Sequence, residues 1–252
     1  MPLALRLLAI GFTLSSFAMS ASADDWVVTY ELPGVQTTSA TLQLGGTETF
    51  DNRALGYVNF GTSFGGSING QFQGAYIDVA REHGGAGGQG RFATTNRNPA
   101  VFAYSLQLDR PVNYFGHWLS SLDAGNVITF YKGASMVGSF NMSQLLLPSL
   151  TGQTAYFGNP NPAFLNGWSA EAFVFVNFYR VGTLEGFDRV VLSEAWQTYP
   201  GSYDSDNHTV GLYQLIGGIA LVPEPSRGAM LVIGALLVLG LTRGARGPWR
   251  AR

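Results

Sequence analysis

Short runs rich in aromatic and β-branched residues recur along most of the chain, and their spacing constrains the fold more than any other feature. Such runs alternate with glycine-containing or Asp/Asn-containing turns, and strands at intervals of about 8–12 residues without a long amphipathic helix are typical of antiparallel sandwiches. We therefore predict an all-β fold, a jelly-roll-like antiparallel β-sandwich forming one domain over residues 24–222. The predicted strands are 24–30, 38–44, 54–60, 72–79, 89–93, 101–108, 112–119, 126–132, 135–140, 170–179, 187–195 and 207–215.

Glycine and proline give three more local expectations. Gly45 and Gly46 are expected to end the second strand, and the glycine-rich residues 61–70 are expected to separate two strands as a loop. Residues 142–150 predict one helical turn that stops at Pro148, because proline inside a helix removes a hydrogen bond and clashes with the preceding turn.

The charge balance of the predicted domain excludes some partners. Residues 24–222 contain 8 Lys and Arg against 15 Asp and Glu, a net charge of −7; residues 223–252 contribute +4 and Arg6 contributes +1, which gives −2 for the whole chain. An acidic domain argues against nucleic acid or anionic lipid as its partner. The chain has no cysteine, so it forms neither disulfides nor thiolate metal sites.

The first 23 residues have the pattern of a secretory signal peptide. Arg6 supplies a positive charge, residues 7–17 are apolar, and Ala21 and Ala23 form an A-x-A cleavage site before Asp24. We expect a signal peptidase to cleave there and the export machinery to carry the domain across a membrane.

The last thirty residues have three parts. Pro223, Glu224 and Pro225 come first, and residues 228–242 follow as fifteen uncharged, mostly apolar residues. A helix of that length is roughly 22 Å long, and flanking arginines that snorkel can adapt it to a hydrocarbon core of ~30 Å. The chain then ends in an arginine cluster, which the positive-inside rule keeps cytoplasmic. This cluster consists of Arg243, Arg246, Arg250 and Arg252.

This tail, residues 223–252, resembles the PEP-CTERM sorting signal in the order and spacing of its parts. The resemblance implies that an exosortase, an integral-membrane enzyme, recognises the segment Pro223–Pro225 and cuts there. It also implies export across the inner membrane of a Gram-negative-type bacterium, with a transient membrane anchor, to the cell surface or extracellular matrix. The alternative is an ordinary C-terminal membrane anchor that follows a proline-containing linker.

The domain itself is similar to a recurrent core of exosortase-dependent surface proteins. That resemblance implies a secreted sandwich domain and a destination, and it lends no reaction to the chain. It rests on residues 114–118, 122–131, 138–140, 172–178, 187–192 and 205–210.

Two short motifs match enzyme patterns without the structural context these need. Ser63 is the centre of a G-x-S-x-G sequence, but the glycines after it will not begin the helix of a hydrolase nucleophile elbow. Gly85, Gly87 and Gly90 fit G-x-G-x-x-G, but no βαβ unit surrounds them. Glu171, Glu185 and Glu194 are not paired by the sequence as a glycosidase would require. We therefore predict a non-enzymatic protein.

The remaining candidates are binding residues. Asp204, Asp206 and Asn207 offer the oxygen ligands that Ca²⁺ prefers, although an Asp/Asn-rich turn before a strand is the alternative. His83, His117 and His208 lack a metal-ligand spacing, and His117 is expected to be a packed residue. Trp168, Trp196 and Tyr199 lie in loop-like sequence and are candidate glycan contacts. The alternative function is thus a carbohydrate-binding module for exopolysaccharide, stabilised by calcium.

Overall fold

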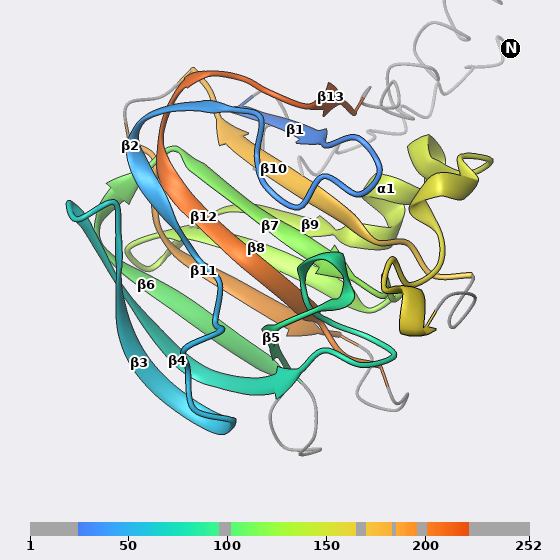
Figure 1. Ribbon diagram of the computed structural model, residues 1–252. Helices are drawn as coiled ribbons and strands as arrows, with labels where there is room; N and C mark the ends of the chain where they lie inside the picture. Colours follow the sequence, from blue (N-terminus) through green and yellow to red (C-terminus); the bar gives the residue numbers. More distant parts are fainter. Residues whose placement is uncertain (1–24, 96–101, 165–169, 183–184, 196–200, 222–252) are drawn as a thin grey trace, which may run out of the picture.

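The computed structural model describes residues 25–95, 102–164, 170–182, 185–195 and 201–221. Within these residues, thirteen strands form one antiparallel sheet accompanied by one α-helix and short 3-10 helices (Figure 1). The predicted all-β antiparallel fold is confirmed. The strands are β1 (Trp26–Tyr30), β2 (Thr41–Glu48), β3 (Gly56–Phe64), β4 (Ile68–Val79), β5 (Arg91–Thr94), β6 (Ala103–Val112), β7 (Tyr114–Ser120), β8 (Asn126–Lys132), β9 (Ser135–Asn141), β10 (Val174–Arg180), β11 (Phe187–Glu194), β12 (Asp204–Leu215) and β13 (Ile219–Ala220). The helices are η2 (Ala86–Gly88), α1 (Met142–Leu150), η3 (Thr154–Tyr156) and η4 (Pro162–Phe164).

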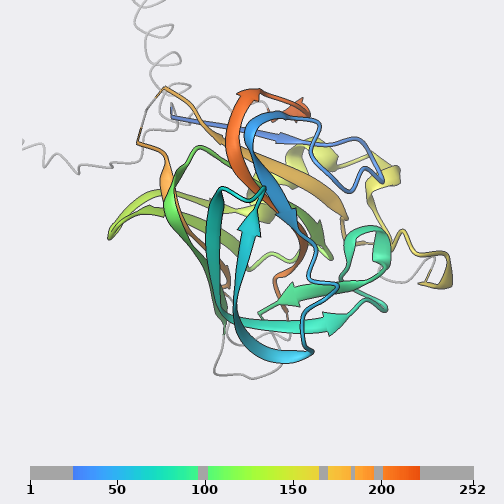
Figure 2. The same cartoon turned by 60° about the vertical axis from the view of Figure 1, so that its left-hand side comes forward.

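The sheet curls round, so that strands near its two ends face each other (Figures 1 and 2). The strand order is β13-β1-β10-β7-β12-β5-β4-β6-β11-β8-β9, with β2 beside β12 and β3 beside β4. Trp26, near one end of this order, donates its indole N–H to the Val137 carbonyl on β9, at the other end, over 2.9 Å. The layers that the sequence predicts as a sandwich therefore belong to one continuous, curled sheet.

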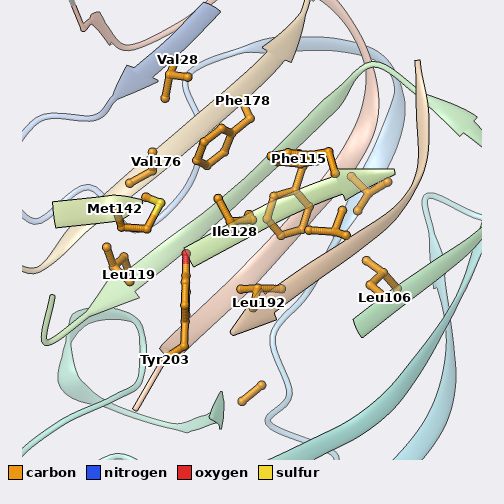
Figure 3. Packing of buried hydrophobic residues seen from close by; sticks show 14 of the residues in the cluster. Val28, Leu106, Phe115, Leu119, Ile128, Met142, Val176, Phe178, Leu192 and Tyr203 are labelled. Atoms are coloured by element: carbon orange, nitrogen blue, oxygen red, sulfur yellow. The ribbon is translucent and has the colours of Figure 1, made fainter. Parts of the chain in front are cut away.

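The space enclosed by the curl holds one large hydrophobic core (Figure 3). Leu106, Phe115, Ile128, Phe178 and Leu192 are fully buried and come from five different strands. Because these strands belong to both halves of the curled sheet, burial of their side chains stabilises the closed arrangement as well as each strand.

Two glycine segments predicted to end strands lie inside strands instead. β2 continues through Gly45 and Gly46 to Glu48, and β3 and β4 extend into the glycine-rich segment and leave only residues 65–67 as a hairpin turn. A Cβ atom on Gly65 would lie 2.2 Å from the Gly45 carbonyl oxygen, so the turn packs directly on the β2 backbone. The glycines therefore permit a close backbone approach and do not end strands.

This close approach predicts different effects for two neighbouring substitutions. Gly65 and Gly66 both have positive φ, +63° and +75°, but a Cβ on Gly66 would meet nothing within 4 Å. Gly66→Ala should cost about 1–2 kcal/mol of unfolding free energy from backbone strain alone. Gly65→Ala should cost a further ~1–3 kcal/mol, because the β2 backbone must move away. Urea denaturation of both variants measures the difference, and equal losses would contradict the predicted contact.

Helix α1 also runs further than the sequence indicates. Asn141 caps it by accepting a hydrogen bond from the Gln144 N–H, and the helix continues past Pro148 to Leu150. Met142, Leu146 and Leu150 are fully buried at a spacing of four residues, so the apolar face reaches across the proline. The prediction that Pro148 ends the helix is wrong, because burial of Leu150 favours one more turn.

Candidate functional site

Most of the predicted site residues lie outside the described residues. These include the sorting motif Pro223–Pro225, the cleavage site at Ala21 to Asp24, the C-terminal arginine cluster and the candidate glycan contacts Trp168, Trp196 and Tyr199. They stay predictions. Among the helices that the structure describes, none has the length and apolar character needed to cross a membrane; the predicted span at 228–242 lies outside that part.

The candidate calcium residues are described, and they do not form a turn. Asp204 and Asp206 are buried and are the first and third residues of β12. Asn207 has a left-handed backbone with φ 49°. The Asp206 carboxylate accepts hydrogen bonds from the backbone N–H groups of Ala86 and Asn207, and the Asn207 side-chain amide donates to the Gln36 carbonyl. No group of three or more His, Cys, Asp or Glu residues that could hold a metal ion occurs in the described part. Calcium binding here stays a prediction.

Ser63 lies on a strand and not at a nucleophile elbow. It is exposed on β3, and the chain after it turns directly into β4. With Asn69, Gln71 and Gln107 it lines an open hollow of about 610 Å³ on the outside of the sheet. The structure thus agrees with the sequence in giving Ser63 no helix and no elbow geometry.

Strands β7 and β10 are buried on both faces, and this creates a second apolar layer. Every residue of both strands is buried. Phe115 and Leu119 belong to the main core, whereas Trp118 packs with Phe173 and Phe175 on the opposite face of the sheet. Strands covered on both faces read as continuous apolar runs, and residues 172–178 have that pattern. The apolar run at 172–178 is therefore the sequence feature that indicates a covered outer face.

Three loops cover this outer face. The segments after β1, after β4 and after α1 gather on the same side of the sheet in both views (Figures 1 and 2). The Tyr156 hydroxyl donates to the Glu31 carbonyl over 3.0 Å, and the Asn159 side-chain amide donates to the Glu82 carbonyl over 2.6 Å. These hydrogen bonds join the three segments over Trp118.

A pocket of about 340 Å³ remains between the loops, and we call it the Trp118 pocket. No residue with a charged side chain lines it. Trp118 is 1% exposed, and its indole N–H has no hydrogen-bond partner among the described residues. The pocket is lined by Pro33, Gly34, Trp118, Thr154, Ala155, Tyr156, Phe157, Gly158, Asn159, Pro160 and Phe173.

A cluster of carboxylates lies at the end of the same face. Burial, together with the nearby carboxylates of Glu171, Glu194 and Asp204, raises the pKa of Asp123 to about 6, although a hydrogen bond from the Ser202 N–H acts in the opposite direction. The buried Ser121 hydroxyl donates to Glu171. The sequence did not pair these residues because they come from separate elements.

Two of the three histidines meet in the main core. The ring centroids of His117 and His208 are 5.9 Å apart. Tyr203 hydrogen-bonds to Nε2 of His117 over 2.9 Å, and Ser205 hydrogen-bonds to Nε2 of His208 over 2.9 Å. Burial lowers the pKa of His117 well below its usual value and lowers the pKa of His208 to about 3. His117 is thus a packed residue, as predicted, but it lies within a polar network that the sequence did not indicate.

No family model, curated protein or solved structure matches the chain significantly. We take the Trp118 pocket as the candidate site in the described residues, because hydrogen bonds between three segments hold its walls together.

Proposed function

We propose that the protein is a non-enzymatic, exported component of the cell surface or extracellular matrix, with a jelly-roll-like body that an exosortase releases from its C-terminal sorting signal. The tripartite tail and the N-terminal A-x-A site motivate the proposal. The position of the folded body relative to the two processing sites supports it.

The observation that carries the proposal is the position of the two proposed cleavage sites: both lie outside every described strand. β1 begins at Trp26, three residues after Ala23, and β13 ends at Ala220, three residues before Pro223. β13 pairs with β1, and the Leu221 N–H donates to the Val28 carbonyl over 3.0 Å. In the sequence, one proposed processing site therefore comes just before β1 and the other just after β13, and these two strands are neighbours at one edge of the sheet. Removal of both terminal segments would take away no part of the sheet.

We expect the protein recovered from the surface and medium of its native cells to start at Asp24 and to end near Pro223–Pro225. Intact-mass measurement with sequencing of both termini tests this. A combined Pro223→Ala, Glu224→Ala and Pro225→Ala variant should retain residues 228–252, because the recognition segment is lost. Ser226→Ala, just outside the motif, serves as the matched control and should be processed normally. A native product that still carries the C-terminal arginines would mean a membrane-anchored protein and would refute the exosortase route.

A further inference from the structure

We propose that, before the C-terminal cut, the side of the domain around β13 rests on the membrane surface through three exposed apolar side chains. These are Leu215, Ile216 and Ile219, which we call the apolar rim. The inference rests on the proposed function, because it concerns the intermediate that the tail still anchors. It adds an interaction surface and its partner, the headgroup region of the bilayer, which the sorting signal by itself does not imply.

The first argument is the concentration of exposed apolar side chains at one place. Eight large hydrophobic residues are exposed in the described part of the chain, and three of them fall within residues 215–219. These three are between 41% and 63% exposed. They lie from the end of β12 to the start of β13, along the upper side of Figure 1. Single exposed apolar residues are ordinary, whereas a group of them marks a contact surface.

The second argument is the absence of charge around the apolar rim. Residues 32–47 and 207–221 contain no Asp, Glu, Lys or Arg, whereas residues 24–222 as a whole contain 23 of them. The two segments lie side by side, because β2 pairs with β12. The otherwise acidic domain therefore has one side that these two charge-free segments form.

The loop between β1 and β2 continues this side up to the apolar rim. The Gly218 N–H donates to the Ser39 hydroxyl over 2.8 Å. Glu31, the carboxylate that precedes the loop, is buried and accepts hydrogen bonds from the Ser39 N–H and hydroxyl and from the Asn177 amide. The negative surface potential of a membrane with anionic lipids repels exposed carboxylates. The charge-free side is thus the one that can approach a bilayer closely.

The third argument is the short connection to the predicted membrane span. Leu221 is the last described residue, and the six residues 222–227 separate it from the predicted span at 228–242. Even a fully extended chain of that length reaches at most about 25 Å. While the tail is attached, the apolar rim therefore stays near the bilayer, and contact with the headgroup region removes apolar surface from water. This contact would hold the segment Pro223–Pro225 at the membrane surface, where an integral-membrane enzyme can reach it.

The experiment measures lipid contact at single sites of the full-length chain, reconstituted in dioleoylphosphatidylcholine vesicles. Because the chain has no cysteine, one introduced cysteine carries one environment-sensitive fluorophore. The sites are Ile216→Cys in the apolar rim, Leu55→Cys as the matched control and Leu236→Cys within the predicted span. Leu55 is similarly exposed, at 54%, and precedes β3, which lies on the opposite side of the molecule from β13 in Figures 1 and 2.

The vesicles also contain a phosphatidylcholine that carries a doxyl quencher high on its acyl chain. Amphipathic surfaces bury their apolar face about 5–10 Å into the headgroup boundary, so we expect the quencher to lower the emission at Ile216→Cys roughly twofold or more. Emission at Leu55→Cys should stay unchanged. The label at Leu236→Cys should be quenched, because the span lies in the bilayer.

A second set of variants separates contact by the apolar rim from mere nearness of the tail. With the label at Ile219→Cys, the combined changes Leu215→Gln and Ile216→Gln should remove most of the quenching, because an amide favours water over the apolar interface. Leu55→Gln is the matched control and should leave the quenching unchanged. Replacing part of the phosphatidylcholine by phosphatidylglycerol should not increase the quenching, because the domain has a net charge of −7.

Three results would overturn the proposal in vesicles where quenching at Leu236→Cys shows that the tail is inserted. These are emission at Ile216→Cys as insensitive to the quencher as that at Leu55→Cys, unchanged quenching in the glutamine variant, or quenching that requires phosphatidylglycerol. Emission at Ile216→Cys that depends on protein concentration and not on the quencher would mean that the apolar rim binds a second copy of the chain. A label at Leu236→Cys that the quencher does not reach would instead refute the membrane anchor, and with it the proposed function.

Discussion

Acidification from pH 6.5 to pH 5 should remove about 2 kcal/mol of folding stability for each of two buried histidines, His117 and His208. Both rings are fully buried, and burial holds their pKa values below the ordinary 6.5, with His208 at about 3. Below pH 6.5 the unfolded chain binds protons at these two residues while the folded protein does not. Stability therefore falls as the pH falls, from the unfolded pKa of 6.5 towards the folded pKa.

Two aspartates act in the opposite direction. Burial raises the pKa of Asp206 to about 7 and that of Asp123 to about 6. The folded protein takes up protons at these residues before the unfolded chain does, so their contribution to stability rises as the pH falls. The net pH dependence of the wild-type protein combines both effects. Only a comparison with histidine variants isolates the histidine contribution.

The measurement is the free energy of urea unfolding at pH 6.5 and pH 5 for the wild type, His117→Gln and His208→Gln. Each variant should be less stable at pH 6.5, but its change between the two pH values should differ from that of the wild type by about 2 kcal/mol. NMR of the imidazole C–H groups provides a direct control, because the His208 signal should not titrate between pH 8 and pH 4.5. A His208 titration midpoint near 6.5 would contradict the predicted burial.

Phe130→Ala should cost about 3–5 kcal/mol of unfolding free energy. The Phe130 ring lies 4.5 Å from Trp26, 4.9 Å from Phe187 and 5.2 Å from Phe178, measured between centroids. These partners belong to strands at both ends of the curled sheet, so the cavity would open where the two halves meet. Folded domains have a total stability of about 5–15 kcal/mol, and this loss is a large part of it.

The neighbouring residue supplies the matched control for Phe130. Tyr131 lies on the opposite face of β8, partly buried, with the Arg189 guanidinium 4.1 Å from its ring centroid. Tyr131→Ala should cost only about 0.5–1 kcal/mol, the value of an exposed cation–π contact. Urea midpoints of both variants test the pair. Similar losses would mean that Phe130 does not join the two halves of the sheet.

The alternation of residue types along short segments predicted the strand positions. The places where the observed strands and helix differ from the prediction have a common cause. The sequence located most strands to within a few residues, because alternation and turn residues are properties of a short segment. It failed where a distant contact decides the conformation. Gly45 and Gly46 continue β2 because the hairpin turn at Gly65 packs on them, and Pro148 does not end α1 because Leu150 is buried beyond it.

The candidate pocket was only partly visible in the sequence. The continuous apolar run at 172–178 indicates a strand covered on both faces, but it does not say what covers it. No pattern in the sequence singles out Trp118 from the other aromatic residues. Its position in a separate outer layer depends on loops from three distant parts of the chain, and those contacts have no local signature.

By itself, the sequence determined the all-β antiparallel class, the approximate strand boundaries and the absence of disulfides, since each depends on residue types and short-range periodicity. Only the tertiary structure decided which buried polar groups meet. The left-handed Asn207 interrupts the alternation of β12, so that Ser205 and His208, three residues apart, both face the core and lie within 2.9 Å of each other. One irregular residue, held in place by pairing with distant strands, thus creates a polar network that period-2 alternation would have divided between opposite faces of the sheet.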